Sequence, residues 1–145
     1  MKTRGVIILA AILSISLEAA AQSIQVPSAW TNQRGSTLYL EALSANGQIT
    51  GYYVNRASGT SCQNIPYPLV GWVYGSGITF TVKWQGSIQS CNSITSWTGF
   101  LYQGRINTLW QLVINGSTST GQIQQGNDIF SPAQAVTHKS LMQSH

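Results

Sequence analysis

The sequence predicts an all-β fold, an eight-stranded antiparallel up-and-down β-barrel, and three observations lead there. Polar and apolar residues alternate with a period of two, as in residues 36–42 and 78–84, which is typical of half-buried strands. Turn-forming pairs such as Asn46-Gly47 and Asn115-Gly116 recur at short intervals. No stretch after residue 22 has a helical period. Consecutive antiparallel strands of this number form a sandwich or a closed barrel, and closure removes the exposed strand edges.

The N-terminal segment, residues 1–21, is predicted to be a signal peptide. Lys2 and Arg4 precede a twelve-residue apolar run at 6–17, and three alanines at 19–21 provide the small residues that a signal peptidase requires. The run is far shorter than the roughly 20 residues that span a bilayer. We therefore expect cleavage near Ala21 and a mature protein that is secreted, extracellular or periplasmic, and not membrane-bound.

The mature chain is predicted to be one domain. Residues 22–27 form a short N-terminal extension, residues 28–131 form the barrel and residues 132–145 form a flexible tail. The strands are expected at 29–33, 36–44, 48–55, 67–74, 77–84, 93–103, 105–114 and 121–130. Two longer connections interrupt this series, 56–66 and 85–92, and each contains one cysteine. In an up-and-down meander both connections emerge at the same end of the barrel.

The two cysteines, Cys62 and Cys91, are expected to form a disulfide, because an exported chain matures in an oxidising compartment. The bond would link the two longer connections across one mouth of the barrel. A metal site is the alternative for paired thiols. Such a site would lack further ligands, since the only histidines, His138 and His145, lie in the tail. No metal is expected.

Charge is scarce in this chain, with seven Lys or Arg and three Asp or Glu among 145 residues. Removal of the signal peptide leaves five bases and two acids, Glu41 and Asp128, a formal charge of +3. Disorder is disfavoured, because 43% of the residues are hydrophobic and the net charge is small. Nucleic-acid binding is disfavoured as well, since the basic residues are scattered singly and form no stripe that could follow phosphates.

Several predicted strands place polar and aromatic side chains on one face. Trp30 and Asn32 share a face by alternation, and so do three further sets: Tyr53 with Asn55, Ser93 with Thr95 and Trp97, and Asp128 with Phe130. If these faces point inward, the barrel interior contains hydroxyls, amides and a carboxylate, and such groups need a ligand or water as partners. If they point outward, the polar groups are simply solvated. Periodicity alone leaves both alternatives open.

Six segments in order and spacing closely resemble the avidin and streptavidin family: WTNQRGS (30–36), GYY (51–53), VKW (82–84), SITSWTG (93–99), RINTLWQL (105–112) and GNDIF (126–130). The match covers roughly residues 28–131. The resemblance implies an eight-stranded barrel whose open end binds biotin non-covalently and with high affinity, in a secreted protein that sequesters biotin and is not an enzyme. Biotin would be a bound ligand, and no covalent cofactor is expected.

The resemblance also implies roles for individual residues. Asn32, Ser36 and Tyr53 would donate to the ureido oxygen of biotin, while Asp128 and Asn55 would accept from its two ring NH groups. Thr95 would face the thioether sulfur and Ser93 the valerate carboxylate. Apolar walls around the ligand would come from Trp84, Trp97, Trp110 and Leu112.

Some features resemble the dimeric, rhizavidin-like branch of the family. Residues 54–57, 62–64, 66–68 and 91–93 match that branch, in which a disulfide joins the same two loops. Tetrameric members place a tryptophan between strand seven and the final motif, where it covers a neighbour's ligand, but residues 115–125 contain none. The resemblance therefore implies a homodimer. Outward-facing residues that could form the interface are Tyr52, Val54, Leu109 and Val113. At Arg34 the best-known members have leucine.

Two other classes of function are compatible with parts of the sequence. A lipocalin-like carrier of another small apolar ligand would share the barrel and the export signal, but it does not need three donors aimed at one urea oxygen. A hydrolase could be built from Ser36 or Ser93 with Asp128, but it would need an ordered histidine, and both histidines lie in the tail.

Overall fold

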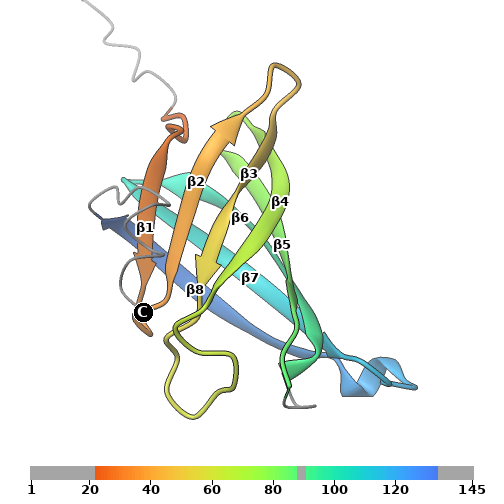
Figure 1. Ribbon diagram of the computed structural model, residues 1–145. Coiled ribbons are helices and arrows are strands. Elements are labelled where there is room, and N and C mark those ends of the chain that lie inside the picture. The colour runs from red at the N-terminus through yellow and green to blue at the C-terminus, as the bar shows by residue number, and fades with distance from the viewer. Residues whose placement is uncertain (1–21, 88–90, 134–145) are drawn as a thin grey trace, which may run out of the picture.

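The computed structural model describes residues 22–87 and 91–133, which form one closed antiparallel barrel. Each strand pairs with the next along the chain, and the last strand pairs with the first (Figure 1). The strands are β1 (Ser28–Asn32), β2 (Thr37–Leu43), β3 (Gln48–Val54), β4 (Pro66–Tyr74), β5 (Gly77–Trp84), β6 (Ser93–Tyr102), β7 (Arg105–Ile114) and β8 (Gln124–Ala133). The fold class and all eight strands expected from the sequence are confirmed.

The expected start of the last strand, at residue 121, is wrong. Residues 120–122 form a 3-10 turn, η2 (Thr120–Gln122), and β8 begins only at Gln124. The Gln122 side chain causes this, because its Oε1 accepts hydrogen bonds from the backbone NH groups of Thr118 at 2.6 Å and Ser119 at 3.0 Å. Such local side-chain bonds compete with a strand ladder.

The end of the last strand also differs from the expectation. β8 continues past residue 130 to Ala133, because Pro132 and Ala133 pair with Trp30 and Ala29 of β1.

The predicted signal peptide and residues 134–145 of the predicted tail, with both histidines, lie outside the described residues. Among the described residues, no helix is long and apolar enough to cross a membrane.

One half of the barrel interior is filled with apolar side chains. Phe80, Phe130, Leu38 and Ile106 are fully buried, and Phe80 stacks on Trp97 with ring centroids 4.8 Å apart. The N-terminal extension contributes as well, since Ile24 is buried against this cluster. Alternating strand positions supply these residues, which explains why the periodicity of the sequence is so regular. The packed half closes one end of the barrel.

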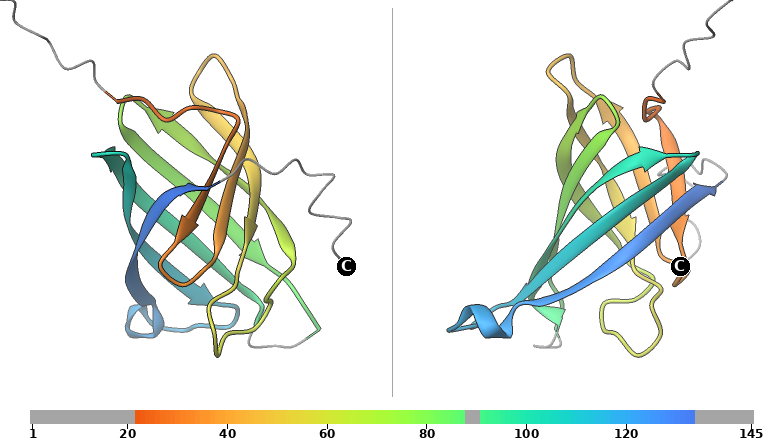
Figure 2. Two further views of the ribbon diagram at one scale, coloured as in Figure 1. Left: turned by 90° about the vertical axis from the view of Figure 1, so that its left-hand side faces the viewer. Right: turned by 180° about the vertical axis from the view of Figure 1, so that it is seen from behind.

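The other end of the barrel carries the connections after β1, β3, β5 and β7 (Figures 1 and 2). The long β3–β4 connection projects from this end, and η2 lies there beside the tips of β7 and β8. Cys62 and Cys91 form the expected disulfide between the β3–β4 and β5–β6 connections, with a Cα–Cα distance of 5.8 Å. The meander and the linked loops thus define one open end.

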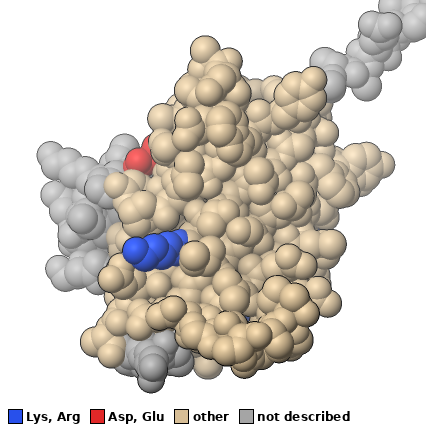
Figure 3. Space-filling view, turned by 90° about the vertical axis from the view of Figure 1, so that its right-hand side faces the viewer, with Lys and Arg blue, Asp and Glu red and all other residues tan. Residues whose placement is uncertain are grey.

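The outer surface bears few charges and several apolar side chains. The side of the molecule in Figure 3 is almost entirely uncharged. Leu109 is 70% exposed and Val113 38% exposed, as expected. Val54 lies on the outer face but is only 2% exposed, so the expectation that it forms exposed interface is wrong. Val54 is instead buried in a small outer cluster with Ala29 and Tyr39, against which Tyr52 packs.

Candidate functional site

The open half of the barrel encloses a cavity of about 480 Å³. Its position explains the mixed polar and aromatic faces of the strands, because those faces point inward and meet there. All residues that the sequence analysis named for a ligand line this cavity: Asn32, Ser36, Tyr53, Asn55, Trp84, Ser93, Thr95, Trp97, Trp110, Leu112 and Asp128. Ligand pockets have this size and this combination of apolar walls with a few polar groups.

Hydrogen-bond donors gather where β1, β2 and β3 meet. The Asn32 Oδ1 atom accepts from the backbone NH groups of Ser36 at 2.9 Å and Arg34 at 3.0 Å. These two bonds orient the amide, so its nitrogen is directed toward Tyr53 and donates to the Tyr53 hydroxyl at 3.3 Å. The Ser36 Oγ accepts from the Arg56 backbone NH at 2.9 Å, which leaves its proton available to a partner in the cavity.

The Tyr53 hydroxyl is a donor that stays protonated. Its ring is 3% exposed and lies between Trp84 and Trp97, with centroid distances of 5.7 Å and 4.8 Å. Burial, and after it the negative charge of Asp128, raises the pKa of the Tyr53 phenol far above its usual value, although the Ser36 hydrogen bond and the charge of Arg34 act in the opposite direction. A neutral phenol at all ordinary pH values can donate to a carbonyl oxygen.

Asp128 supplies the acceptor opposite these donors. Its Oδ2 atom accepts from the Trp97 indole NH at 2.9 Å, and its Oδ1 atom accepts from the Gln33 amide at 3.1 Å. The Gln33 amide also donates to the Asn127 carbonyl, and its oxygen accepts from the Ile129 NH at 2.9 Å, so this side chain joins the β1–β2 loop to β8. A carboxylate offers about four acceptor positions. Asp128 therefore keeps capacity for a donor on a ligand.

Asn55 connects the cavity to the β3–β4 loop. Its amide nitrogen donates to Thr60 Oγ1 at 2.8 Å and to the Ser61 carbonyl at 3.1 Å. Its oxygen accepts from the Ala57 NH at 3.0 Å and from the Ser36 hydroxyl at a long 3.4 Å. The Ser36 contact is the longest and weakest of these hydrogen bonds, so a donor on a ligand can readily replace the Ser36 hydroxyl at the Asn55 oxygen.

The tryptophans form the walls of the cavity and also orient its polar groups. The Trp84 indole NH donates to Thr95 Oγ1 at 2.8 Å, which leaves the Thr95 proton free for another acceptor. Trp110 crosses the inner face of β8 at Gly126, where a Cβ atom would lie 2.5 Å from the indole Cζ2. Glycine at this position is therefore a condition for the observed Trp110 orientation.

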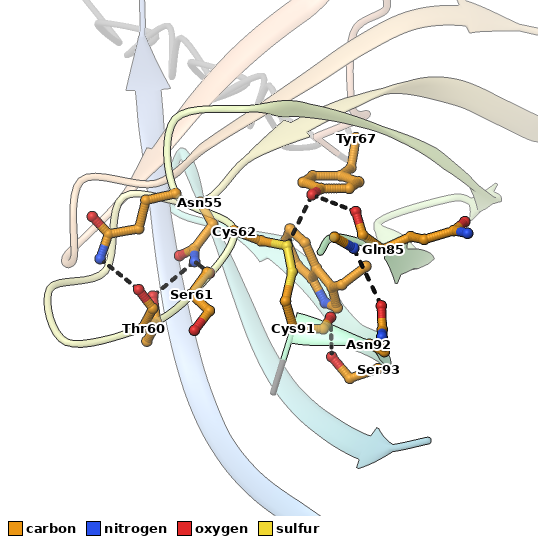
Figure 4. Close-up of a disulfide and its surroundings, with 12 residues drawn as sticks. Asn55, Thr60, Ser61, Cys62, Tyr67, Gln85, Cys91, Asn92 and Ser93 are labelled. Carbon is orange, nitrogen blue, oxygen red and sulfur yellow. Dashed lines mark hydrogen bonds between the residues drawn. A yellow bond between two sulfur atoms is a disulfide. The ribbon is translucent and has the colours of Figure 1, made fainter. Parts of the chain in front are cut away.

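The disulfide and its neighbours join the β3–β4 and β5–β6 loops at the mouth (Figure 4). The Tyr67 hydroxyl donates to the Gln85 carbonyl at 2.9 Å beside Cys62, and Gly86 leaves room for both sulfur atoms. The Asn92 carbonyl accepts from the Asn115 NH at 2.8 Å, which links the β5–β6 and β7–β8 loops. The rim is thus braced before any ligand enters.

Some lining residues were not named as ligand contacts by the sequence analysis: Arg34, Ala57, Gly59, Thr60, Ser61, Ile114 and Gln124, together with Cys62 and Cys91, which were named only as a disulfide. Ile114 continues the alternation of Trp110 and Leu112, so the period of two could have identified it. The loop residues carry no periodic signal. Their place in the site depends on how the β3–β4 loop folds back over the mouth.

Comparison with known proteins gives the family. The Avidin family model matches residues 20–133. The chain belongs to the avidin family. This membership confirms the expectation of a binding protein rather than an enzyme. Within the family, the chain is 47% identical over 118 residues to Afifavidin from Afifella pfennigii, covering 77% of this chain and 73% of that protein.

Two solved avidin-family structures have the same barrel. The crystal structure of apo shwanavidin (P1 form) superimposes with a TM-score of 0.73 at 55% identity, covering 78% of this chain and all of that chain. The crystal structure of a rhizavidin–biotin complex gives a TM-score of 0.67 at 41% identity, covering 79% of this chain and 97% of that chain. The resemblance to the rhizavidin-like branch is therefore supported by both sequence and structure.

Proposed function

We propose that this avidin-family protein binds biotin non-covalently, at one site inside each barrel. The observation that carries this proposal is the convergence of three donors, Asn32, Ser36 and Tyr53, on one end of the cavity, with the carboxylate of Asp128 beside them. A cyclic urea has the complementary pattern of one carbonyl oxygen and two NH groups. The rhizavidin structure is a complex with biotin, which favours the same ligand here. A purely apolar ligand would offer these donors no acceptor and Asp128 no donor, so their arrangement would serve no purpose in a carrier of such a ligand.

Binding of biotin requires few changes in the hydrogen bonds among the polar groups of the cavity. The ureido oxygen accepts from Asn32, Tyr53 and the Ser36 hydroxyl, and Ser36 gives up only its 3.4 Å contact with Asn55. That exchange frees an acceptor position on Asn55 for one ring NH, while Asp128 accepts from the other. Sites that are organised before binding avoid much of the entropy cost of ordering side chains.

The remaining parts of the ligand fit the other end of the cavity. The Thr95 hydroxyl donates to the thioether sulfur, because the Trp84 NH already occupies its oxygen. Ser93, which is 8% exposed, meets the valerate carboxylate near the disulfide. Trp84, Trp97, Trp110 and Leu112 enclose the bicyclic ring and the chain. Biotin is the ligand in this proposal, with no covalent cofactor and no metal.

The proposal also covers the location and the oligomeric state of the protein. We infer secretion to the extracellular space or periplasm after cleavage near Ala21, and sequestration of biotin there rather than an action on nucleic acid or membranes. A homodimer is supported by apolar side chains on the outer faces of β6, β7 and β8, where Ile94 pairs with Val113 and where Phe100 and Leu109 are more than half exposed.

Titration calorimetry with free biotin tests the binding proposal. We expect heat of binding at one biotin per chain and a higher melting temperature with excess biotin. In a parallel measurement, the protein should be retained on immobilised biotin and released by free biotin. The absence of both heat and a thermal shift would rule out biotin as the ligand. Retention that free biotin does not compete would indicate adhesion to the matrix.

A further inference from the structure

The few charges of this protein are distributed unevenly along the barrel axis. Among the described residues, four are cations, and three of them, Arg34, Arg56 and Lys83, lie at the open end. Arg34 is in the β1–β2 loop, Arg56 is the second residue after β3, and Lys83 is the penultimate residue of β5. All three are exposed. The fourth, Arg105, begins β7 at the closed end.

The described acids do not neutralise this arrangement. Glu41 lies beyond the middle of β2, toward the closed end, and Asp128 is 4% exposed inside the cavity. Three positive charges therefore stand against the single charge of Asp128 at the open end, which leaves an excess of +2 there, whereas Arg105 and Glu41 balance at the closed end. On a surface with so few charges, little else in the described barrel offsets this excess.

Two of the rim cations are held near the mouth by contacts within the barrel. The Arg56 guanidinium donates to Thr37 Oγ1 at 2.8 Å, next to the start of β2. Arg34 lines the cavity, and its charge acts on the Tyr53 phenol inside it. The field of these groups thus reaches the entrance and the interior. A cleft with one sign of charge and apolar walls focuses the field and raises the local concentration of oppositely charged ligands.

We propose that the rim cations Arg34, Arg56 and Lys83 make the barrel select for ligands with a free carboxylate, by accelerating their association. This inference rests on the proposed function. Free biotin carries one negative charge on its valerate chain at neutral pH, whereas biotin joined through an amide carries none. The protein therefore captures free biotin faster than amide-linked biotin, and the difference depends on salt because exposed charges are screened.

Stopped-flow tryptophan fluorescence on the full mature chain tests the proposal. Association rates of biotin and of neutral biotinamide are compared at about 10 mM and about 150 mM NaCl, where the Debye length falls from about 30 Å to about 8 Å. Because salt screens the attraction of the exposed rim charges, the association rate of biotin should decrease about twofold over this range. The biotinamide rate should not change.

Substitutions of the cations test whether their charge causes the faster association of biotin. The triple variant Arg34→Gln, Arg56→Gln, Lys83→Gln should lose the salt dependence for biotin, and its low-salt rate should approach that for biotinamide. The variant Arg34→Lys, Arg56→Lys keeps the charges but not the guanidinium contacts, and it should behave as wild type. Arg105→Gln removes one charge from the far end and is the matched control for each single replacement at the rim.

The proposal would be overturned by an equal salt dependence for biotin and biotinamide, or by an Arg105→Gln effect as large as that of a single rim replacement. A lysine variant that behaves like the glutamine variant would also overturn it, because contact rather than charge would then be responsible. If neither ligand changes the fluorescence or gives heat, the proposed function itself fails, which is a distinct result.

Discussion

The polar side chains of the cavity are held in position by bonds to the backbone and to one another. Asn32 is oriented by two backbone NH groups, Asp128 by Trp97 and Gln33, and Thr95 by Trp84. No buried side-chain nitrogen or oxygen among the described residues lacks a hydrogen-bond partner. The contribution of each residue to biotin binding can therefore be tested by single substitution, because the neighbouring side chains are held in position.

Replacement of Asp128 by alanine should accelerate release of biotin about 10- to 100-fold, because a hydrogen bond to a charged acceptor contributes about 1.5–3 kcal/mol. The dissociation rate can be followed by exchange of labelled biotin. Glu41→Ala is the matched control, since it removes the other acid among the described residues from an exposed outer position. Unchanged release from Asp128→Ala would contradict its assignment to the ring NH.

The raised pKa of Tyr53 predicts a loss of stability in alkali. The unfolded phenol ionises near pH 10, whereas the folded one retains its proton, so this contribution is complete below pH 10 and is lost as the pH rises above it. We expect the free energy of unfolding to fall by about 1 kcal/mol more in wild type than in Tyr53→Phe between pH 9 and pH 11. Urea denaturation at both pH values measures this, and parallel losses in the two proteins would refute it.

At the scale of elements, strands supply the site and loops brace its rim. The alternation along β1, β3, β6 and β8 predicted one face of each strand that carries polar and aromatic side chains, with Asn32, Tyr53, Thr95 and Asp128 among them. In the structure these four faces meet in the cavity. The β3–β4 loop was not predictable in this way, because its shape depends on Asn55, Thr60 and Gln63 bonding to backbone groups within the loop. Such contacts have no periodic signature.

Gly126→Ala should weaken binding by displacing Trp110. The added Cβ would lie 2.5 Å from the indole Cζ2, so the ring must move away from the cavity wall. A decrease in affinity of about tenfold corresponds to about 1.4 kcal/mol of lost or strained contact. Gly121→Ala is the matched control, because its Cβ would meet Ser119 Oγ only at an ordinary 3.8 Å. Equal calorimetric affinities for the two variants would show that Trp110 adapts without loss.

Loss of the disulfide should reduce binding more than it disturbs the fold. The Cys62→Ser, Cys91→Ser variant opens a closed loop with a sequence separation of 29, which lowers the free energy of unfolding by about 3–4 kcal/mol in the chain-entropy model. The packed end of the barrel is remote from this loop and should keep its circular dichroism spectrum. Dissociation of biotin should accelerate, because the β3–β4 loop must now be ordered on binding. Identical affinities in the two proteins would deny the bond any role at the mouth.

At the scale of the whole molecule, the apolar outer faces of β6–β8 predict self-association. Leu109→Lys places a charge at the centre of that surface and should shift a dimer to monomer in sedimentation equilibrium, with the circular dichroism spectrum unchanged. Thr50→Lys is the control, because Thr50 is exposed on β3, which lies opposite β7 in the closed barrel. A wild-type monomer, or dissociation by Thr50→Lys alone, would place the interface elsewhere or remove it.

The sequence alone determined the strand order, the pairing of Cys62 with Cys91 as the only two cysteines, and the alternation that separates inner from outer positions. These follow from local periodicity and composition, which need no knowledge of distant contacts. Tertiary structure decided which face is inside, that Val54 is buried, and that Gln122 delays β8. It also decided that three of four described cations surround one mouth, since closure of the barrel brings together loops that are far apart in the chain.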